Sequence, residues 1–281
     1  MRRVAAGDMR EQGAALVVVL WICAVVALLA GGFTLSVTLE ARRLSAQVRG
    51  AEARALVEAG LAHAVMGLRQ PNAQRRWVPD GREYRVAEEG ASLSVRVWDE
   101  GGRLDLNRAP PPVLEAVLGM EVAAWTAARR TAGQPAASIA ELAGAGGPGA
   151  AAYRDAAPLA TVHGAADGTV SALAAPPALL RAWPGLTAAD AAALLEARRA
   201  GQAPGRELAG RAQAAGLAVD RPPGPAFTVR VEVAGGQGAR ASAEAVLWIA
   251  VDAASAYRIL EWREPAPDLH LPGTDAGMNQ Q

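Results

Sequence analysis

The sequence contains no lysine, one cysteine, three histidines and few aromatic residues, which make up 4% of the chain. The single cysteine, Cys23, excludes an intrachain disulfide framework and a cysteine-rich zinc site. His63, His163 and His270 are scattered along the chain, which argues against a histidine zinc site. The 28 basic residues, all arginine, balance 28 acidic residues, and this zero net charge argues against a general nucleic-acid binder. What remains is an apolar-rich chain of 281 residues, long enough for one or two domains.

Patterns typical of an enzyme are also missing. Two glycine-rich runs, 144–147 and 235–238, lack the lysine and the strand-to-helix context of phosphate-binding loops. His163 is a single histidine in a glycine-rich loop, and we expect it to be exposed rather than catalytic. The sequence therefore predicts a protein that is not an enzyme and holds no cofactor.

The most prominent feature that is present is an uncharged, apolar run from residue 13 to residue 39. As a helix this run is about 40 Å long, which exceeds the hydrocarbon core of a bilayer, about 30 Å. It is also longer than the apolar region of a cleaved secretory signal, about 7–15 residues. The run therefore predicts a membrane-spanning helix. Arginines precede and follow it in similar number, so the positive-inside rule does not settle its orientation.

The helical pattern continues beyond the apolar run, and Pro71 closes it. Small or apolar residues recur at steps of three and four, which predicts one stripe along the helix. The stripe consists of Leu44, Val48, Ala51, Ala55, Ala59, Ala62 and Met66. We expect one helix over 14–70, with its first half in the membrane and its second half packed on a soluble domain through this stripe.

A short polar leader, residues 1–13, precedes the apolar run and ends in Gly13. A basic leader, a glycine and an unbroken helix resemble the start of type IV pilins, in which a prepilin peptidase cleaves after the glycine. The resemblance implies cleavage between Gly13 and Ala14. Most such proteins carry glutamate at the fifth mature position, where this sequence has Val18. A bare carboxylate is costly in lipid, so an apolar residue suits a subunit at the tip of a fibre, which has no outer neighbour to pair with it.

Strands are predicted in two groups that lie far apart in the sequence. The first group covers 82–86 and 92–98, with Gly90 at the turn between them. The second group covers 227–233, 245–251 and 257–262. Together with the helix they predict an α+β fold, in which the long N-terminal membrane-spanning helix packs on a pilin-like antiparallel sheet.

The segment between the strand groups, 107–221, is rich in alanine and punctuated by proline, and it contains an internal duplication. The first copy covers 106–130 and the second covers 175–199. In both copies prolines open a helix, a glycine turns the chain, and a second helix ends in paired arginines. The run LRAWPGLT at 180–187 matches a helix-hairpin-helix, a motif that binds the DNA backbone in other proteins. We interpret the segment as a large all-α insert that contacts proteins, with DNA binding as the alternative, and we assign no elements over 145–172.

The order of these parts resembles the GspK-type minor pseudopilin of type II secretion systems, over nearly the whole chain. The run AALVVVLW at 14–21 lacks the usual glutamate, as this family does. The run RALVEAG at 54–60 resembles the helix that follows the membrane segment in the family. The run DEGGRLDLN at 99–107 resembles the family's junction D-E-x-G-K-I-N-L-N, after which a large helical insert splits the sheet.

This resemblance implies a protein at the tip of the pseudopilus that helps initiate and cap the fibre for protein export across the outer membrane. The implied partners are the minor pseudopilins of the I and J types, the major pseudopilin, the prepilin peptidase and the inner membrane, with exoproteins or the secretin as further contacts and no nucleic acid. The protein would cross the inner membrane once, with its soluble domain in the periplasm. The alternative is a membrane-anchored DNA-binding or DNA-uptake protein that uses the helix-hairpin-helix motifs.

Some members of this family bind calcium in the soluble domain. The candidate oxygen donors in this sequence form no recognisable calcium loop, so metal binding stays unassigned. We expect these acids in turns or on the solvated surface. They are Asp99, Glu100, Asp105, Asp252 and Asp268.

The predicted organisation has five parts. They are a cleaved leader at 1–13, the membrane and spine helix at 14–70, a sheet body at 71–106 and 222–264, the helical insert at 107–221, and a flexible tail at 265–281.

Overall fold

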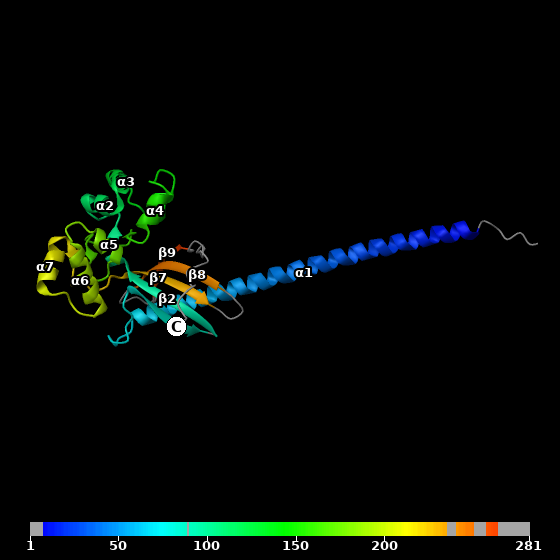
Figure 1. Ribbon diagram of the computed structural model, residues 1–281, viewed down its shortest axis with the longest axis horizontal. Coiled ribbons are helices and arrows are strands. Elements are labelled where there is room, and N and C mark those ends of the chain that lie inside the picture. Colours follow the sequence, from blue (N-terminus) through cyan, green and yellow to red (C-terminus); the bar gives the residue numbers. More distant parts are fainter. Residues whose placement is uncertain (1–7, 89, 235–239, 250–256, 264–281) are drawn as a thin grey trace, which may run out of the picture. The chain divides into compact units, whose positions relative to one another are not determined.

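The computed structural model describes residues 8–88, 90–234, 240–249 and 257–263. The chain divides into two compact units, residues 1–54 and residues 55–281, and each is considered by itself. Strand and helix labels follow Figure 1.

Helix α1, Asp8–Leu68, accounts for the described part of the first unit and continues into the second. The helix expected over 14–70 is thus present, but it begins earlier, within the expected leader. Among the residues that the structure describes, no helix combines the length and the apolar content needed to cross a membrane. The membrane anchor therefore stays a prediction.

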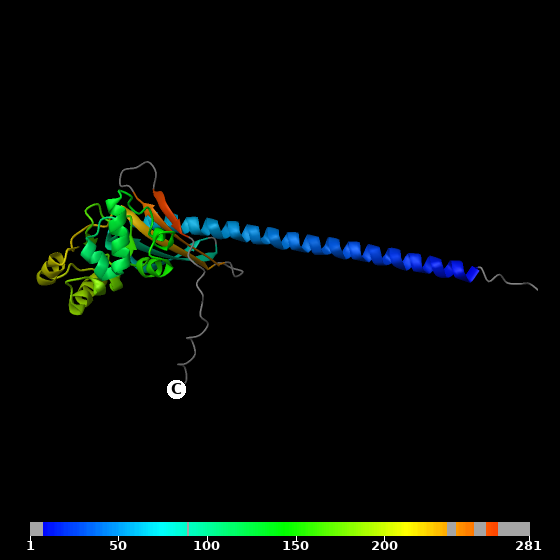
Figure 2. The ribbon, with the colours of Figure 1, turned by 90° about the horizontal axis from the view of Figure 1, so that it is seen from above.

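The second unit is built on a five-stranded antiparallel sheet with the strand order β1-β2-β7-β8-β9. Its strands are β1 Asp80–Glu88, β2 Ala91–Asp99, β7 Ala226–Ala234, β8 Arg240–Trp248 and β9 Arg258–Arg263. Figure 1 shows β2, β7, β8 and β9 side by side, and Figure 2 shows the same sheet from above. The antiparallel sheet predicted from sequence is confirmed.

Strand β8 differs most from its prediction, because it begins at Arg240 rather than at residue 245. Its first residues are small, with Ala241 opposite Val233 and Ala243 opposite Val231. Alanine has a low intrinsic preference for strands, and the sequence predicted a strand only from residue 245 onward. Pairing with the valines of β7 overrides that preference. Residues 250 and 251 of the predicted strand lie outside the described residues.

One face of the sheet is covered by residues 55–68 of α1. Val57, Leu61, Ala64 and Val65 of the helix are buried in a cluster with apolar residues of β2, β7 and β8. The helix backbone lies close to the sheet at Gly60, because an added Cβ atom there would lie 2.5 Å from a methyl carbon of the Val231 side chain.

The prediction of which face of α1 packs on the sheet was wrong. Met66, a member of the predicted stripe, is 58% exposed, and Ala55 is exposed as well. Both helix faces carry small residues at helical spacing, so periodicity alone did not separate them. The face that packs carries the larger aliphatic side chains, such as Leu61 and Val65, whose burial removes more apolar area from water.

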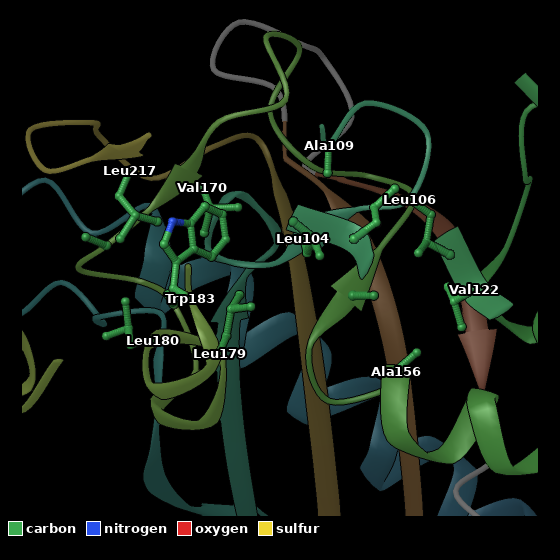
Figure 3. Packing of buried hydrophobic residues seen from close by; sticks show 14 of the residues in the cluster. Leu104, Leu106, Ala109, Val122, Ala156, Val170, Leu179, Leu180, Trp183 and Leu217 are labelled. Atoms are coloured by element: carbon green, nitrogen blue, oxygen red, sulfur yellow. The ribbon is translucent and has the colours of Figure 1, made fainter. Parts of the chain in front are cut away.

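Between β2 and β7 the chain forms a helical insert with its own core. Its helices are α2 Pro111–Leu118, α3 Met120–Thr131, α4 Ala150–Ala156, α5 Pro177–Ala182, α6 Ala188–Arg199 and α7 Arg206–Ala214. Two short 3-10 helices also occur, η1 Glu100–Gly102 and η2 Ile139–Ala143. Figure 3 shows part of this core, where Trp183 lies near Leu179 and Val170.

The duplication seen in the sequence extends into the structure. Each copy begins with a two-residue strand that pairs in parallel with a strand beyond the helices. In the first copy β3 Leu104–Asp105 pairs with β4 Ala160–Thr161, and in the second β5 Val170–Ser171 pairs with β6 Leu217–Ala218. The copies are therefore longer than the hairpins alone, and they include helix α4 and strands β4 and β5, where the sequence predicted no elements.

The arginines that end the hairpins explain the repeated pattern. Arg130 donates from Nη2 to the backbone carbonyls of Leu106 and Ala109, at 2.7 and 2.8 Å. In the second copy Arg198 donates from Nη1 to the carbonyl of Ala175 at 2.8 Å. In both copies the last turn of the second helix is thus tied to the segment just before the first helix.

Candidate functional site

The junction between the sheet and the insert concentrates buried acidic residues. Asp99, Glu100 and Asp105 have only 2%, 0% and 1% of their surface exposed. The sequence predicted these acids in turns or on the solvated surface. The prediction of solvent exposure was wrong. They are buried because the segment that leaves the sheet and the segment that returns to it cross here, between the core of the sheet and the core of the insert. Their carboxylates accept the hydrogen bonds that join these segments.

Glu100 joins the sheet to the insert directly. It accepts a hydrogen bond from the Thr228 hydroxyl of β7 at 2.6 Å and another from the Thr161 hydroxyl of β4. Its Oε1 also lies 3.3 Å from Nη1 of Arg103, whose side chain is almost fully buried. A buried charge pair of this kind holds its geometry, because separating either partner leaves an uncompensated charge.

Asp99 joins the segment that leaves the sheet to the segment that returns to it. Its carboxylate accepts hydrogen bonds from the Gly101 amide at 2.9 Å and from the Gly224 amide at 3.2 Å. Burial raises the pKa of the Asp99 carboxyl above its usual range, although both amides act in the opposite direction.

Asp105 organises the start of the insert. It accepts hydrogen bonds from the amides of Asn107 at 2.7 Å and Gly164 at 3.1 Å, and it pairs with Arg108 at 2.8 Å. Asn107 in turn exchanges two hydrogen bonds of 2.8 Å with the backbone of Ala136. The junction motif predicted from sequence is thus a set of structural hydrogen bonds.

The acids of the junction do not form a metal centre. Within the described ranges, no group of three or more histidine, cysteine, aspartate or glutamate side chains is placed to hold a metal ion. The candidate donors Asp252 and Asp268 lie outside the described residues.

Strand β9 makes a second connection between sheet and insert. Glu261 accepts a hydrogen bond from the Ser138 hydroxyl at 2.5 Å, and its other oxygen lies 3.9 Å from Nε2 of His163. Arg263 reaches Glu261 at 2.5 Å and Glu244 of β8 at 3.2 Å. His163 was predicted to be exposed, but its side chain is only 20% exposed because it packs at this connection.

The second hairpin turns at Gly185, whose φ of +87° favours glycine. This turn packs inside the insert, because the Trp183 indole donates to the carbonyl of Ala215 at 2.9 Å. Arginines of the hairpin are occupied as well, since Arg198 binds backbone carbonyls and Arg199 pairs with Glu196 at 3.1 Å. Nothing in this arrangement favours DNA binding over protein contact, and we do not adopt the DNA alternative.

Two cavities lie beside the returning segment Pro222–Pro225 and share it as a wall. The first has a volume of about 560 Å³ and is lined mainly by apolar side chains that include Trp77 and Phe227. The second has a volume of about 480 Å³ and is lined by residues that include His163 and Trp248. Sequence reasoning missed both cavities, because they form where segments distant in sequence meet. The proline run at 222–225 was the only local signal.

The processing residues predicted from sequence lie elsewhere. Gly13, Ala14 and Val18 all fall within helix α1, in the first unit. Cleavage after Gly13 and the significance of Val18 stay predictions.

Comparison of the sequence with family models and with curated proteins finds no match. Comparison of the fold does find similarity. A chain of the crystal structure of the GspK-GspI-GspJ complex from the type 2 secretion system of enterotoxigenic Escherichia coli superposes with a TM-score of 0.52 at 13% sequence identity. The similarity covers 80% of this chain and 100% of that chain. The protein therefore has a pseudopilin-like fold.

Proposed function

We propose that the protein is a minor pseudopilin of the GspK type in a type II secretion system. It crosses the inner membrane once, carries its soluble domain in the periplasm, and assembles with minor pseudopilins of the I and J types at the tip of the pseudopilus. It has no catalytic role. The observation that carries the proposal is the order of parts: a long N-terminal helix, an antiparallel sheet, and a helical insert between β2 and β7, matched in fold by a chain of a minor pseudopilin complex.

The junction supports a capping role for the insert. Glu100 connects β4 and β7, Asp99 connects the two crossing segments, and Glu261 connects β9 to Ser138. These contacts hold the insert firmly on the sheet. A rigid insert is what a cap requires, because a mobile one would not exclude a further subunit from the end of a fibre.

The N-terminal sequence supports a place at the tip. A repeating subunit can pair a glutamate at its fifth mature position with the N-terminal amine of a neighbour. Val18 is uncharged and needs no amine partner, so it leaves no unpaired carboxylate in the membrane. After cleavage at Gly13, Ala14 would begin the mature chain.

Complex formation tests this proposal. The full-length protein is coexpressed with the I-type and J-type pseudopilins of the same system, extracted in detergent, and measured by size-exclusion chromatography with light scattering. We expect one complex that contains all three chains. Failure to form it, while the other two chains still associate with each other, would overturn the proposed role.

A further inference from the structure

The segment Pro222–Pro225 forms a fixed ridge on the surface of the second unit. The amide of Gly224 donates to Asp99, and the carbonyl of Pro225 accepts from the amide of Ile249 at 2.7 Å. Pro222, Pro223 and Pro225 are nevertheless exposed. Because proline also restricts the backbone, the ridge presents apolar surface with little conformational freedom to lose on binding.

The two cavities beside this ridge have the size and walls of ligand sites. At about 560 and 480 Å³, each falls within the range of about 300–1,000 Å³ that is typical of such sites. The first cavity has Trp77, Phe227 and Ile249 in its wall. The second has Trp248, which is 40% exposed. Two apolar hollows that share one wall suit successive side chains of a single extended chain.

Among the described residues, the charged side chains that line the cavities are arginines. Arg69 and Arg76 line the first cavity, and Arg108 and Arg221 line the second. Among the described residues that line either cavity, none is acidic. Arg76 donates to the carbonyls of Gln70, at 2.9 Å, and Pro71, at 3.4 Å, so these partners orient the guanidinium without neutralising its charge.

The arginines of the second cavity are paired but keep donors to spare. Arg108 binds Asp105, and Arg221 binds Asp167. Each guanidinium carries five N–H donors, and a single carboxylate cannot engage all of them. An incoming carboxylate can therefore bind at the second cavity without displacing Asp105 or Asp167.

We infer that the ridge and its two cavities bind an extended segment of a partner polypeptide that carries aromatic and acidic side chains. The aromatic side chains enter the hollows beside Trp77 and Trp248, and the carboxylates bind the bordering arginines. The prolines of the ridge support the backbone of the bound segment. This inference goes beyond the proposed tip assembly, because it assigns a binding surface that the proposed function does not invoke.

Fluorescence anisotropy tests the inference with the full-length protein in detergent. The probe is a labelled peptide of about ten residues that contains phenylalanine, aspartate and proline. A matched peptide with lysine in place of aspartate measures the charge requirement, and one with serine in place of phenylalanine measures the apolar requirement. We expect the probe to bind and both control peptides to bind at least about tenfold more weakly.

Matched variants locate the binding surface. We expect Arg76→Gln to weaken probe binding about 5- to 10-fold through loss of a charged partner. Arg85→Gln, on β1 with a side chain 79% exposed and absent from both cavities, should leave the affinity unchanged. Circular dichroism establishes that both variants are folded.

Three results would overturn the inference. The first is no binding of the probe by the folded protein, and the second is equal loss of affinity in the two arginine variants. The third is binding only after removal of residues 264–281, which would identify the chain's own tail as the occupant. Intact complex formation with the I-type and J-type pseudopilins, measured on the same sample, separates failure of this inference from failure of the proposed function.

Discussion

At the scale of single residues, the junction depends on carboxylates that are buried and fully engaged. Glu100 is inaccessible to solvent and accepts hydrogen bonds from Thr161 and Thr228, in two different parts of the fold. Its ion pair with Arg103 is buried as well. Each of these residues is stable in the interior only because the others are present.

Replacing Glu100 by alanine should therefore destabilise the protein severely. The change leaves the guanidinium of Arg103 buried without its partner and two threonine hydroxyls without their acceptor, and we expect a loss of about 3–5 kcal/mol in the free energy of unfolding. Urea unfolding measures this loss. The matched control is Glu196→Ala, at a glutamate 67% exposed in its pair with Arg199, where we expect a change within about 0.5 kcal/mol. Equal effects of the two changes would contradict this account of the junction.

Two aspartates of the second unit, Asp99 at the junction and Asp167 within the insert, should show opposite pH dependence. Burial raises the pKa of Asp99 in the folded protein, so the native state keeps a proton that the unfolded chain has lost, and stability falls as pH rises above about 4. The hydrogen bond from Arg221 lowers the pKa of Asp167 to about 2, so its contribution is present above about 4 and is lost as pH falls through about 2.

Unfolding of Asp99→Asn and Asp167→Asn, each compared with the unchanged protein between pH 2 and 7, measures both effects. The free energy of unfolding of the unchanged protein, relative to Asp99→Asn, should fall with rising pH. Relative to Asp167→Asn, it should rise. Slopes of the same sign in both comparisons would show that one of the two assignments is incorrect.

At the scale of elements, close backbone contact decides where η1 meets the second half of the insert. A Cβ atom on Gly102 would lie 2.5 Å from the carbonyl carbon and oxygen of Ala174, which are backbone atoms that cannot move aside freely. The glycine is therefore required by space rather than by its backbone angles. This contact places the start of the second copy directly against the junction.

Gly102→Ala should cost about 1–3 kcal/mol of stability through this overlap. The control is Gly210→Ala in the interior of α7, where an added Cβ meets no atom within 4 Å. There we expect a gain of about 0.5–1 kcal/mol, because alanine favours the helix. Thermal unfolding of the two variants should move the melting temperature in opposite directions. A Gly102→Ala variant as stable as the unchanged protein would argue against close contact between Gly102 and Ala174.

Sequence patterns predicted the elements best where local preference and packing agree. Leu93, Val95 and Val97 alternate with polar residues and are fully buried, and the strand expected over 92–98 is nearly the observed β2. Alanine-rich segments were harder, because alanine fits a helix, a strand or a loop. The face of α1 was therefore mistaken, and the start of β8 was set too late.

The candidate site was predictable only in part. The run 99–107 was identified as a junction, but its acids were expected near solvent, because the sequence does not show that Thr161 and Thr228 converge on Glu100. The cavities depend on how Pro222–Pro225 approaches Trp77 and Trp248, which no local pattern encodes. Burial and cavities are properties of tertiary contact, and a single sequence carries little information about them.

At the scale of the whole molecule, the proposed N-terminal processing and the proposed cap formed by the insert both concern the tip of a fibre. If Val18 is apolar because the tip has no outer neighbour, Val18→Glu should place an unpaired carboxylate in the membrane and impair assembly. We expect reduced export by the secretion system, measured as exoprotein in the medium. Val18→Leu is the control and should preserve export. Normal export by the Val18→Glu variant would contradict the proposed place of the protein at the tip.

The intact mass of the protein, extracted from the membranes of its own cells, tests directly whether it is a pseudopilin. We expect a mature chain that begins at Ala14, with the leader removed after Gly13 in a manner that depends on the prepilin peptidase. Retention of Met1, or cleavage near Gly32, would contradict it.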